Sequence, residues 1–180
     1  MNRWFAIVPA VVLAGLAALF AFKSLNRDVQ FQPDALVGQP APAVSLTPLE
    51  GGTPVSLTSA IKGPALINVF GSWCVACVVE HPILIKVRDA GLPVVGVAWR
   101  DKPEKTAAFL RDRGNPYATV LMDPDGVAAI GLGITAAPES FLVDARGVII
   151  AKQGGPLTPE IAEAFVAKAK ASASGTPGTK

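Results

Sequence analysis

The chain has 180 residues, of which 51% are hydrophobic and 17% are charged, and its formal net charge is +2. Positive and negative residues are mixed along the chain without a basic stripe, so the composition gives no support to nucleic-acid binding. Apart from an apolar N-terminal stretch, about 150 residues remain, which is the usual size of a single domain.

An uncharged segment runs from Trp4 to Phe22 and is flanked by Arg3 and Lys23. At about 1.5 Å per residue, a helix of this length crosses the apolar core of a bilayer. A cleaved signal peptide is the alternative, but its apolar region is usually shorter and ends at a small-x-small cleavage site, which this segment lacks. We therefore expect residues 1–24 to form a single N-terminal transmembrane helix that anchors the protein. Positive charges on both sides leave its orientation open.

The folded domain is expected to span residues 37–170. Residues 25–36 are expected to link it to the anchor, and the proline-containing stretch continues as far as Pro42. Residues 171–180 consist mostly of Ser, Gly, Pro and Thr, a composition that predicts a flexible tail.

The first half of the domain alternates between strand and helix patterns. Residues 64–70 form a short apolar run typical of a strand buried on both faces, and residues 92–98 form a second one. Between them, residues 75–88 predict a helix. A further helix is expected over residues 103–113, with Asp101 as a candidate cap.

The second half of the domain adds shorter strands. Residues 117–122 predict a strand, and the following DPDG, residues 123–126, predicts a turn. The strands expected at residues 140–143 and 148–152 flank another turn and form an antiparallel hairpin. A last helix is expected to begin at Pro159, because proline suits the first helical position. This order predicts an α/β fold with a central mixed sheet flanked by helices.

The only two cysteines of the chain, Cys74 and Cys77, lie in the sequence GSWCVAC directly after the first predicted strand. They therefore lie at a strand-to-helix junction, where the helix dipole and unpaired N–H groups favour a thiolate. Cys74 is the candidate nucleophile. Cys77, one helical turn later, is placed to attack a mixed disulfide at Cys74 and so release the partner.

Three other uses of a cysteine pair have less support. A structural disulfide across two intervening residues closes too small a loop to remove much chain entropy. A closed zinc or copper site needs about four ligands, and His81 is the only other soft candidate. A c-type haem requires a histidine directly after the second cysteine, where this chain has Val78. We therefore favour a redox-active dithiol, with no metal and no cofactor.

Taken together, these features resemble the thioredoxin family. Residues 73–77, WCVAC, match its W-C-x-x-C motif, and Pro82 matches its helix-kinking proline. Pro138 precedes a predicted strand in the position of the family's cis-proline. The resemblance implies that a cis bond at Pro138 turns backbone groups of Ala137 toward Cys74, where a substrate strand pairs with them.

One branch of this family is more similar than the rest. Residues 133–144, GITAAPESFLVD, resemble the G-V-x-G-A-P-E-T-F-L-I-D stretch of the membrane-anchored thiol:disulfide interchange proteins of cytochrome c maturation, the DsbE/CcmG type. Two residues depart from that branch. Val75 stands where the branch often has proline, and Ala136 stands where it has glycine.

The resemblance implies a periplasm-facing protein-disulfide reductase in the bacterial inner membrane. Its substrates would be cysteines of apocytochrome c, or of an assembly partner, that must stay reduced for haem attachment. It also implies that a transmembrane thiol carrier re-reduces the protein.

Side chains around the dithiol are expected to support this chemistry. Asn68 occupies the place where ordinary thioredoxins carry a buried acid, so Glu80, one turn past Cys77, is the expected substitute; a solvated helix glutamate is the alternative. Glu139 is expected either to extend an acidic rim that selects partners with basic flanks, or to be a surface acid of a turn. Trp73 is expected to shield the dithiol and contact the substrate, or only to pack. The predicted site comprises the catalytic residues Cys74, Cys77 and Glu80 and the substrate-binding residues Trp73, Ala137, Pro138 and Glu139.

Two other functions stay open. A copper carrier or assembly chaperone would retain its metal through Cys74, Cys77 and His81. A general thioredoxin-like oxidant or isomerase with other clients would use the same chemistry at a higher reduction potential.

Overall fold

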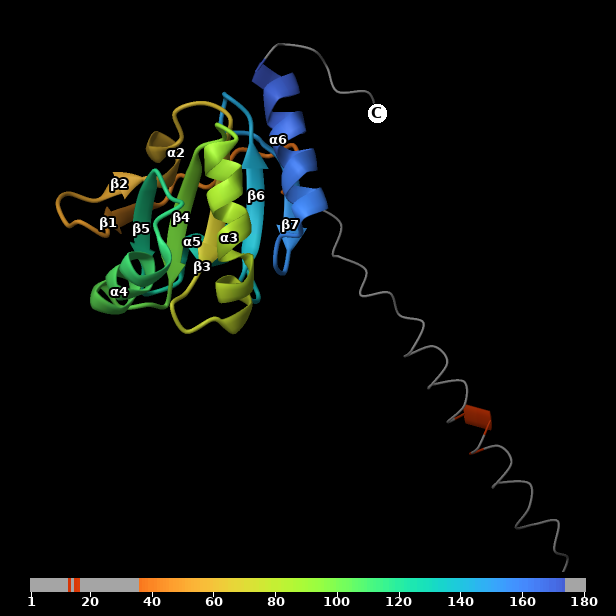
Figure 1. The fold of residues 1–180 in the computed structure, drawn as a ribbon, viewed down its shortest axis with the longest axis horizontal. Coiled ribbons are helices and arrows are strands. Elements are labelled where there is room, and N and C mark those ends of the chain that lie inside the picture. Colours follow the sequence, from red (N-terminus) through yellow and green to blue (C-terminus); the bar gives the residue numbers. More distant parts are fainter. Residues whose placement is uncertain (1–12, 14, 17–35, 174–180) are drawn as a thin grey trace, which may run out of the picture. The chain divides into compact units, whose positions relative to one another are not determined.

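The structure, a computed structural model, describes residues 13, 15, 16 and 36–173 (Figure 1). Residues 36–173 form a seven-stranded sheet with helices on both faces. The elements in chain order are β1 (Ser45–Pro48), β2 (Val55–Ser56), α2 (Leu57–Ala60), β3 (Ala65–Phe70), α3 (Val75–Asp89), β4 (Val94–Trp99), α4 (Pro103–Arg113), β5 (Thr119–Asp123), α5 (Val127–Gly131), β6 (Glu139–Val143), β7 (Ile149–Gly154) and α6 (Pro159–Ala173).

The strand order is β2-β1-β5-β4-β3-β6-β7, and β3 lies between β4 and β6. β3, β4 and β5 are parallel to one another, whereas β1, β6 and β7 pair antiparallel with their neighbours. The central mixed sheet that the sequence predicts is therefore confirmed. The run of apolar residues in β3 is also explained, because a central strand of such a sheet is buried on both faces.

Two hydrophobic cores lie on opposite faces of the sheet, because successive side chains of a strand point in opposite directions. Leu66 and Phe70 of β3 belong to the core beneath α3, α4 and α6. Ile67 and Val69 belong to the other core, with residues of α2 and α5. Asn68 has the same parity as Leu66 and Phe70, so the alternation directs this polar side chain toward α3.

The folded part of the chain includes the expected domain start, and its C-terminal end lies beyond the expected one. Residues 38–41 are part of the folded domain, because the N–H of Gly38 donates to the carbonyl of Ile149 (2.8 Å) and the N–H of Ala41 donates to that of Gly147 (2.9 Å). At the other end, α6 continues to Ala173, past the expected start of the tail at residue 171.

The expected transmembrane helix, residues 1–24, and the linker, residues 25–36, lie almost entirely outside the described residues. Within the part of the chain that the structure describes, no helix is long and apolar enough to cross a membrane.

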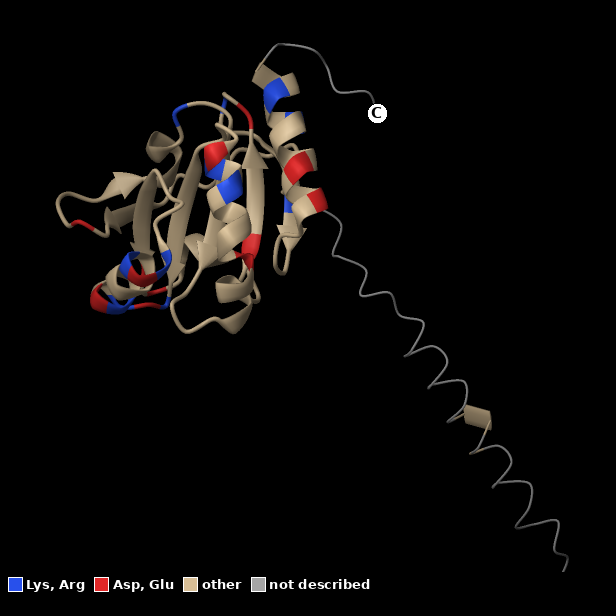
Figure 2. Ribbon diagram, viewed as in Figure 1, with Lys and Arg blue, Asp and Glu red and all other residues tan. Residues whose placement is uncertain are grey.

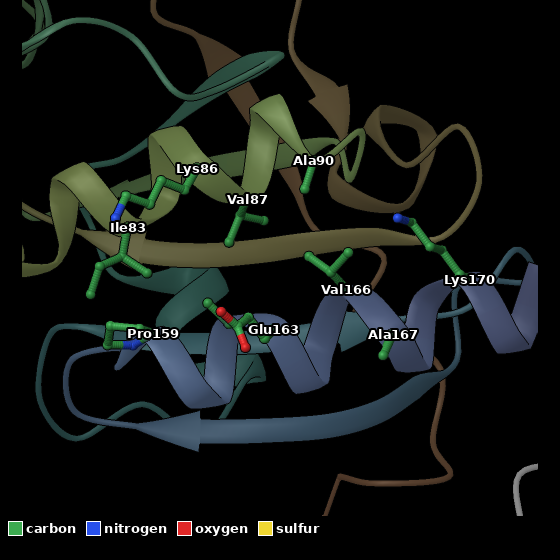
Figure 3. A pocket seen from close by; sticks show the side chains of 10 residues that line it. Ile83, Lys86, Val87, Ala90, Pro159, Glu163, Val166, Ala167 and Lys170 are labelled. Atoms are coloured by element: carbon green, nitrogen blue, oxygen red, sulfur yellow. The ribbon is translucent and has the colours of Figure 1, made fainter.

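A groove of about 340 Å³ runs between α3 and α6 (Figure 3). Val87 of α3 and Val166 of α6 point toward one another across it, and most of its surface is apolar. The groove follows the C-terminal half of α3, whereas the cysteines lie at the start of that helix.

Gly96 lies in β4 where the strand passes under two aromatic rings. A Cβ atom at this position would lie 2.9 Å from the ring of Tyr117 and 3.0 Å from that of Phe70, closer than a buried contact allows. We expect Gly96→Ala to lower the free energy of unfolding by about 2 kcal/mol, because these rings have no room to shift in a packed core. Denaturant unfolding of the two proteins measures the difference. In a Tyr117→Leu background, Gly96→Ala should lower the free energy of unfolding by less. An equal loss in both backgrounds would show that the ring of Tyr117 is not the obstacle.

Candidate active site

Cys74 and Cys77 form a disulfide at the start of α3. Cys74 is the N-cap residue, with extended backbone angles, and its Sγ accepts a hydrogen bond from the N–H of Cys77 (3.1 Å). Both side chains are buried. When the disulfide is reduced, the same N–H and the positive end of the helix dipole are available to stabilise a thiolate at Cys74.

The loop before β6 lies against the disulfide. The Ala137–Pro138 peptide bond is cis, and the carbonyl oxygen of Ala137 lies 3.5 Å from the Sγ of Cys74. Antiparallel pairing of Val69 with Glu139 brings the start of β6 to the end of β3, and so brings this loop to the cysteines. Three of the predicted site residues, Cys74, Ala137 and Pro138, are therefore together in space.

Glu80 lies in α3 one helical turn after Cys77 and is buried, with 1% of its surface exposed. One carboxylate oxygen accepts from the side-chain amide of Asn68, and the other accepts from the N–H of Leu157; both distances are 2.9 Å. Glu80 is therefore buried next to the amide of Asn68, and the alternative of a solvated glutamate is wrong; its role as substitute for the acid of ordinary thioredoxins stays a prediction.

Asn68 is the centre of this polar network. Its amide nitrogen also lies within hydrogen-bond distance of the Oγ of Ser140 (3.0 Å), its direct partner in the pairing of β3 with β6. Its amide oxygen accepts from the hydroxyl of Tyr117 (2.9 Å). Asn68 therefore uses both ends of its amide, and it holds Glu80 in one orientation.

Burial raises the pKa of Glu80 from 4.5 to about 7, even though the hydrogen bonds from Leu157 and Asn68 act in the opposite direction. Burial, together with the charge of Glu80, also raises the pKa of Tyr117 well above its ordinary value. Tyr117 therefore stays a neutral donor, while Glu80 can take up or release a proton near neutral pH.

Asp101 holds the loop that carries the cysteines, a role that the sequence analysis missed. Its carboxylate accepts from the N–H of Ser72 (2.6 Å), from the hydroxyl of Ser72 (2.9 Å) and from the N–H of Lys102 (2.8 Å). The expected cap of α4 is different, because Lys102 is the N-cap residue. The available signal was the strand order: Ser72 follows β3, Asp101 follows β4, and the carboxyl ends of parallel neighbours meet at one edge of the sheet.

Trp73 is both anchored and accessible. Its indole N–H donates to the carbonyl of Trp99 (3.2 Å), and the two rings meet edge to face at 5.9 Å. A Cβ atom at Gly71 would lie 2.5 Å from the indole nitrogen, so glycine is needed for this close approach. Because 53% of Trp73 is exposed, it has surface available next to the disulfide.

The predicted acidic rim is absent from the described surface around the dithiol, and this expectation is wrong. Glu139 is buried, and its carboxylate forms an ion pair with Lys152 (2.8 Å). Glu80 is buried as well. A carboxylate in the interior needs a compensating partner, and each of these two has one inside the protein.

His81, the third expected copper ligand, is directed elsewhere. Its Nε2 lies 2.8 Å from the carbonyl oxygen of Gly114, and its ring packs against Phe109. Burial lowers its pKa. The described residues contain no group of three or more His, Cys, Asp or Glu side chains able to hold a metal ion.

A disulfide at a strand-to-helix junction, faced by a cis-proline, is shared by disulfide oxidoreductases of the thioredoxin fold, and this chain is one of them. Residues 36–169 match the Redoxin family. The thiol:disulfide interchange protein HelX of Rhodobacter capsulatus is 36% identical over 162 residues, which cover 89% of this chain and 92% of that protein. The thiol:disulfide interchange protein DsbE of Xylella fastidiosa is 40% identical over 152 residues, which cover 82% of this chain and 77% of that protein.

A crystal structure of a thiol:disulfide interchange protein from Chlorobium tepidum has a TM-score of 0.60 at 28% identity and covers 72% of this chain and 94% of that one. The chain therefore belongs to the redoxin family and, within it, to the DsbE type of thiol:disulfide interchange proteins.

The raised pKa of Glu80 predicts a pH-dependent stability of the oxidised protein. Between pH 4.5 and about 7 the folded protein holds a proton that the unfolded chain has released, so the free energy of unfolding falls as the pH rises. Over this window the loss is about 3 kcal/mol. Glu80→Gln should lack this contribution. Denaturant unfolding at several pH values measures it: from pH 4.5 to about 7 the free energy of unfolding should fall for the unmutated protein relative to that of the Glu80→Gln protein. Parallel curves for the two proteins would contradict the raised pKa.

Proposed function

We propose that the protein is a periplasm-facing reductant of disulfides in cytochrome c biogenesis. The observation that carries the proposal is the Cys74–Cys77 disulfide at the N-terminus of α3, with the Ala137 carbonyl 3.5 Å from Cys74 and the buried carboxylate of Glu80 one helical turn after Cys77. This arrangement supplies a nucleophile, a resolving thiol, a substrate-facing backbone and a proton acceptor within one site.

The reaction begins with the reduced protein. The Cys74 thiolate attacks one sulfur of the substrate disulfide, and the other substrate sulfur leaves as a thiolate. Cys77 then loses its proton to Glu80 and attacks the Sγ of Cys74, which releases the second substrate sulfur. Two electrons pass to the substrate, and the protein is left with the Cys74–Cys77 disulfide.

Glu80 suits the role of proton acceptor because its pKa, about 7, is close to the ordinary thiol value of about 8.5. An acid with its usual pKa would hold the proton far less well at neutral pH. Glu80 follows Cys77 by one helical turn, on nearly the same face of α3.

Substrate is bound by the surface around Cys74. The backbone beside the cis bond at Pro138 offers the carbonyl of Ala137, against which an extended substrate segment can pair. The exposed part of Trp73 supplies an aromatic contact on the other side of the nucleophile. Glu139, which is paired with Lys152, supports β6 from inside and does not contact the substrate.

The proposed cellular setting is supported by the resemblance of residues 133–144 to the interchange proteins of cytochrome c maturation, and by relatives named thiol:disulfide interchange proteins. The substrates are cysteines of apocytochrome c or of an assembly partner, and a transmembrane thiol carrier re-reduces the protein. Residues 1–24 anchor it in the bacterial inner membrane, residues 25–36 act as the linker, and the domain that begins at residue 37 faces the periplasm.

The two cysteines should fail in different ways when they are replaced. Cys74→Ser removes the nucleophile and should abolish reduction of a disulfide-containing apocytochrome c peptide. Cys77→Ser leaves the nucleophile but not the resolving thiol, so mixed disulfides with the true partners should accumulate. Mass spectrometry of non-reduced samples detects these adducts. Undiminished turnover by the Cys74→Ser protein would rule out the mechanism.

The reduction potential separates a dedicated reductase from an oxidant or isomerase. We expect a value closer to that of thioredoxin, about −270 mV, than to that of strong oxidants of this fold, about −120 mV. Equilibration with glutathione and dithiothreitol buffers measures it, with tryptophan fluorescence as the readout, to which Trp73 next to the disulfide contributes. A value on the oxidising side would move the protein toward disulfide formation or isomerisation.

A further inference from the structure

A cleft of about 470 Å³ opens beside the dithiol, between the cysteine loop and α4. We call it the basic cleft. Figure 2 shows that charged residues of both signs gather at α4, which forms one side of it. The residues that carry the argument are Trp73, Arg100, Lys102, Lys105, Phe109 and Arg113.

The basic cleft begins next to the nucleophile. Trp73 lines it and directly precedes Cys74 in the chain. A partner joined to Cys74 through a mixed disulfide must place the residues that flank its own cysteine close by, since an extended chain advances only about 3.3 to 3.6 Å per residue. A flanking segment of the partner can therefore reach this cleft during the exchange.

Positive charge exceeds negative charge in the basic cleft, because four cations and two acids line it. Arg100, Lys102, Lys105 and Arg113 are exposed, and within the described residues none of the four forms an ion pair. The two acids that line the cleft are engaged: Asp101 accepts the hydrogen bonds from Ser72 and Lys102, and Asp112 is paired with Arg111.

Two of the cations are held by aromatic rings. The guanidinium of Arg100 lies 5.3 Å from the centre of the Trp99 ring, and that of Arg113 lies 5.6 Å from the centre of the Phe109 ring. An arginine stacked on a ring keeps its N–H donors for an acceptor such as a carboxylate. The side chains are thus partly ordered before any partner arrives, which lowers the entropic cost of binding.

The backbone of Arg100 adds a second sign of a constrained site. Its φ is 48°, in the left-handed region, and it is the only non-glycine residue with positive φ among those described. Glycine would take this conformation without steric cost, whereas arginine takes it with a steric cost. The backbone conformation therefore does not explain why this position carries an arginine side chain. Residues in such conformations cluster at functional sites.

We propose that the basic cleft binds an acidic peptide segment of the partner protein, adjacent to the cysteine that Cys74 attacks. The proposal rests on the disulfide exchange described above. Its charge preference is opposite to that of the acidic rim expected from the sequence, because Glu80 and Glu139 are buried and the cations of the basic cleft are exposed.

Binding can be tested without any disulfide chemistry. Labelled cysteine-free peptides of equal length, rich in Asp and Glu, in Asn and Gln, or in Lys, are titrated into the full-length oxidised protein, with fluorescence anisotropy as the readout. We expect only the acidic peptide to bind, with a Kd that rises about tenfold from low to physiological salt. Equal binding of all three peptides, or no binding of the acidic one, would overturn the proposal.

A matched pair of charge reversals locates the binding site. Lys105→Glu lies in the basic cleft, whereas Lys62→Glu makes the same change of charge just before β3, at the end of that strand remote from Cys74. We expect Lys105→Glu to weaken binding of the acidic peptide about fivefold and Lys62→Glu to leave it unchanged. Equal losses would show an effect of net charge alone and would refute a local site. An oligonucleotide of equal charge that binds as tightly as the peptide would refute peptide recognition.

Rates of disulfide exchange separate this proposal from the proposed function, when the reduced protein is mixed with versions of the three peptides that each carry one cysteine in a disulfide. If the acidic peptide binds but none of the disulfides is reduced, the reductase proposal fails and the basic cleft stands. If all the disulfides are reduced at equal rates and the acidic peptide does not bind, the basic cleft fails and the reductase stands.

Discussion

A carboxylate inside a protein must have its oxygens hydrogen-bonded, and Glu80 meets this requirement with groups from distant parts of the chain. Asn68 reaches it from β3, and the N–H of Leu157 reaches it from the segment before α6. Asn68 in turn binds Tyr117 and lies against Ser140. Hydrogen bonds of Glu80 and Asn68 therefore connect α3, which carries the dithiol, to β3, to β6 and to the segments before β5 and α6. The same burial raises the pKa of Glu80 to about 7.

The two glutamates expected at the dithiol surface are buried. Glu80 is hydrogen-bonded to Asn68, and Glu139 is paired with Lys152 at the start of β6. Cations lie outside, on the exposed wall formed by Arg100 and α4. Between them, Cys74 is faced by the carbonyl of Ala137 and flanked by the exposed indole of Trp73. The carboxylate proposed for proton transfer, Glu80, is thus not paired with the cations proposed for partner recognition.

Much of the fold can be predicted from local patterns. The buried apolar runs of β3 and β4, the helix over Pro103–Arg113 and the hairpin of β6 and β7 all carry clear periodicity or turn signals. The elements that were missed are short. β1 has four residues, β2 has two, α2 has four and α5 has five, and so few residues show no periodicity. They form because the sheet edge and the second core offer them contacts, which local sequence does not reveal.

The sequence by itself determined the chemistry: Cys74 and Cys77 at a strand-to-helix junction, Glu80 one turn further, and Pro138 before the strand that returns to them. Residue type and spacing suffice for the cysteines and Glu80, since they place side chains at one strand end or on one helical face, whereas Pro138 was indicated by the resemblance to the thioredoxin family. The tertiary structure alone decided which charges meet. Glu139, which was expected at the surface, is buried in an ion pair with Lys152. Asp101 holds the cysteine loop by accepting the N–H of Ser72. Burial and ion pairing depend on neighbours far apart in the chain, so composition and spacing cannot specify them.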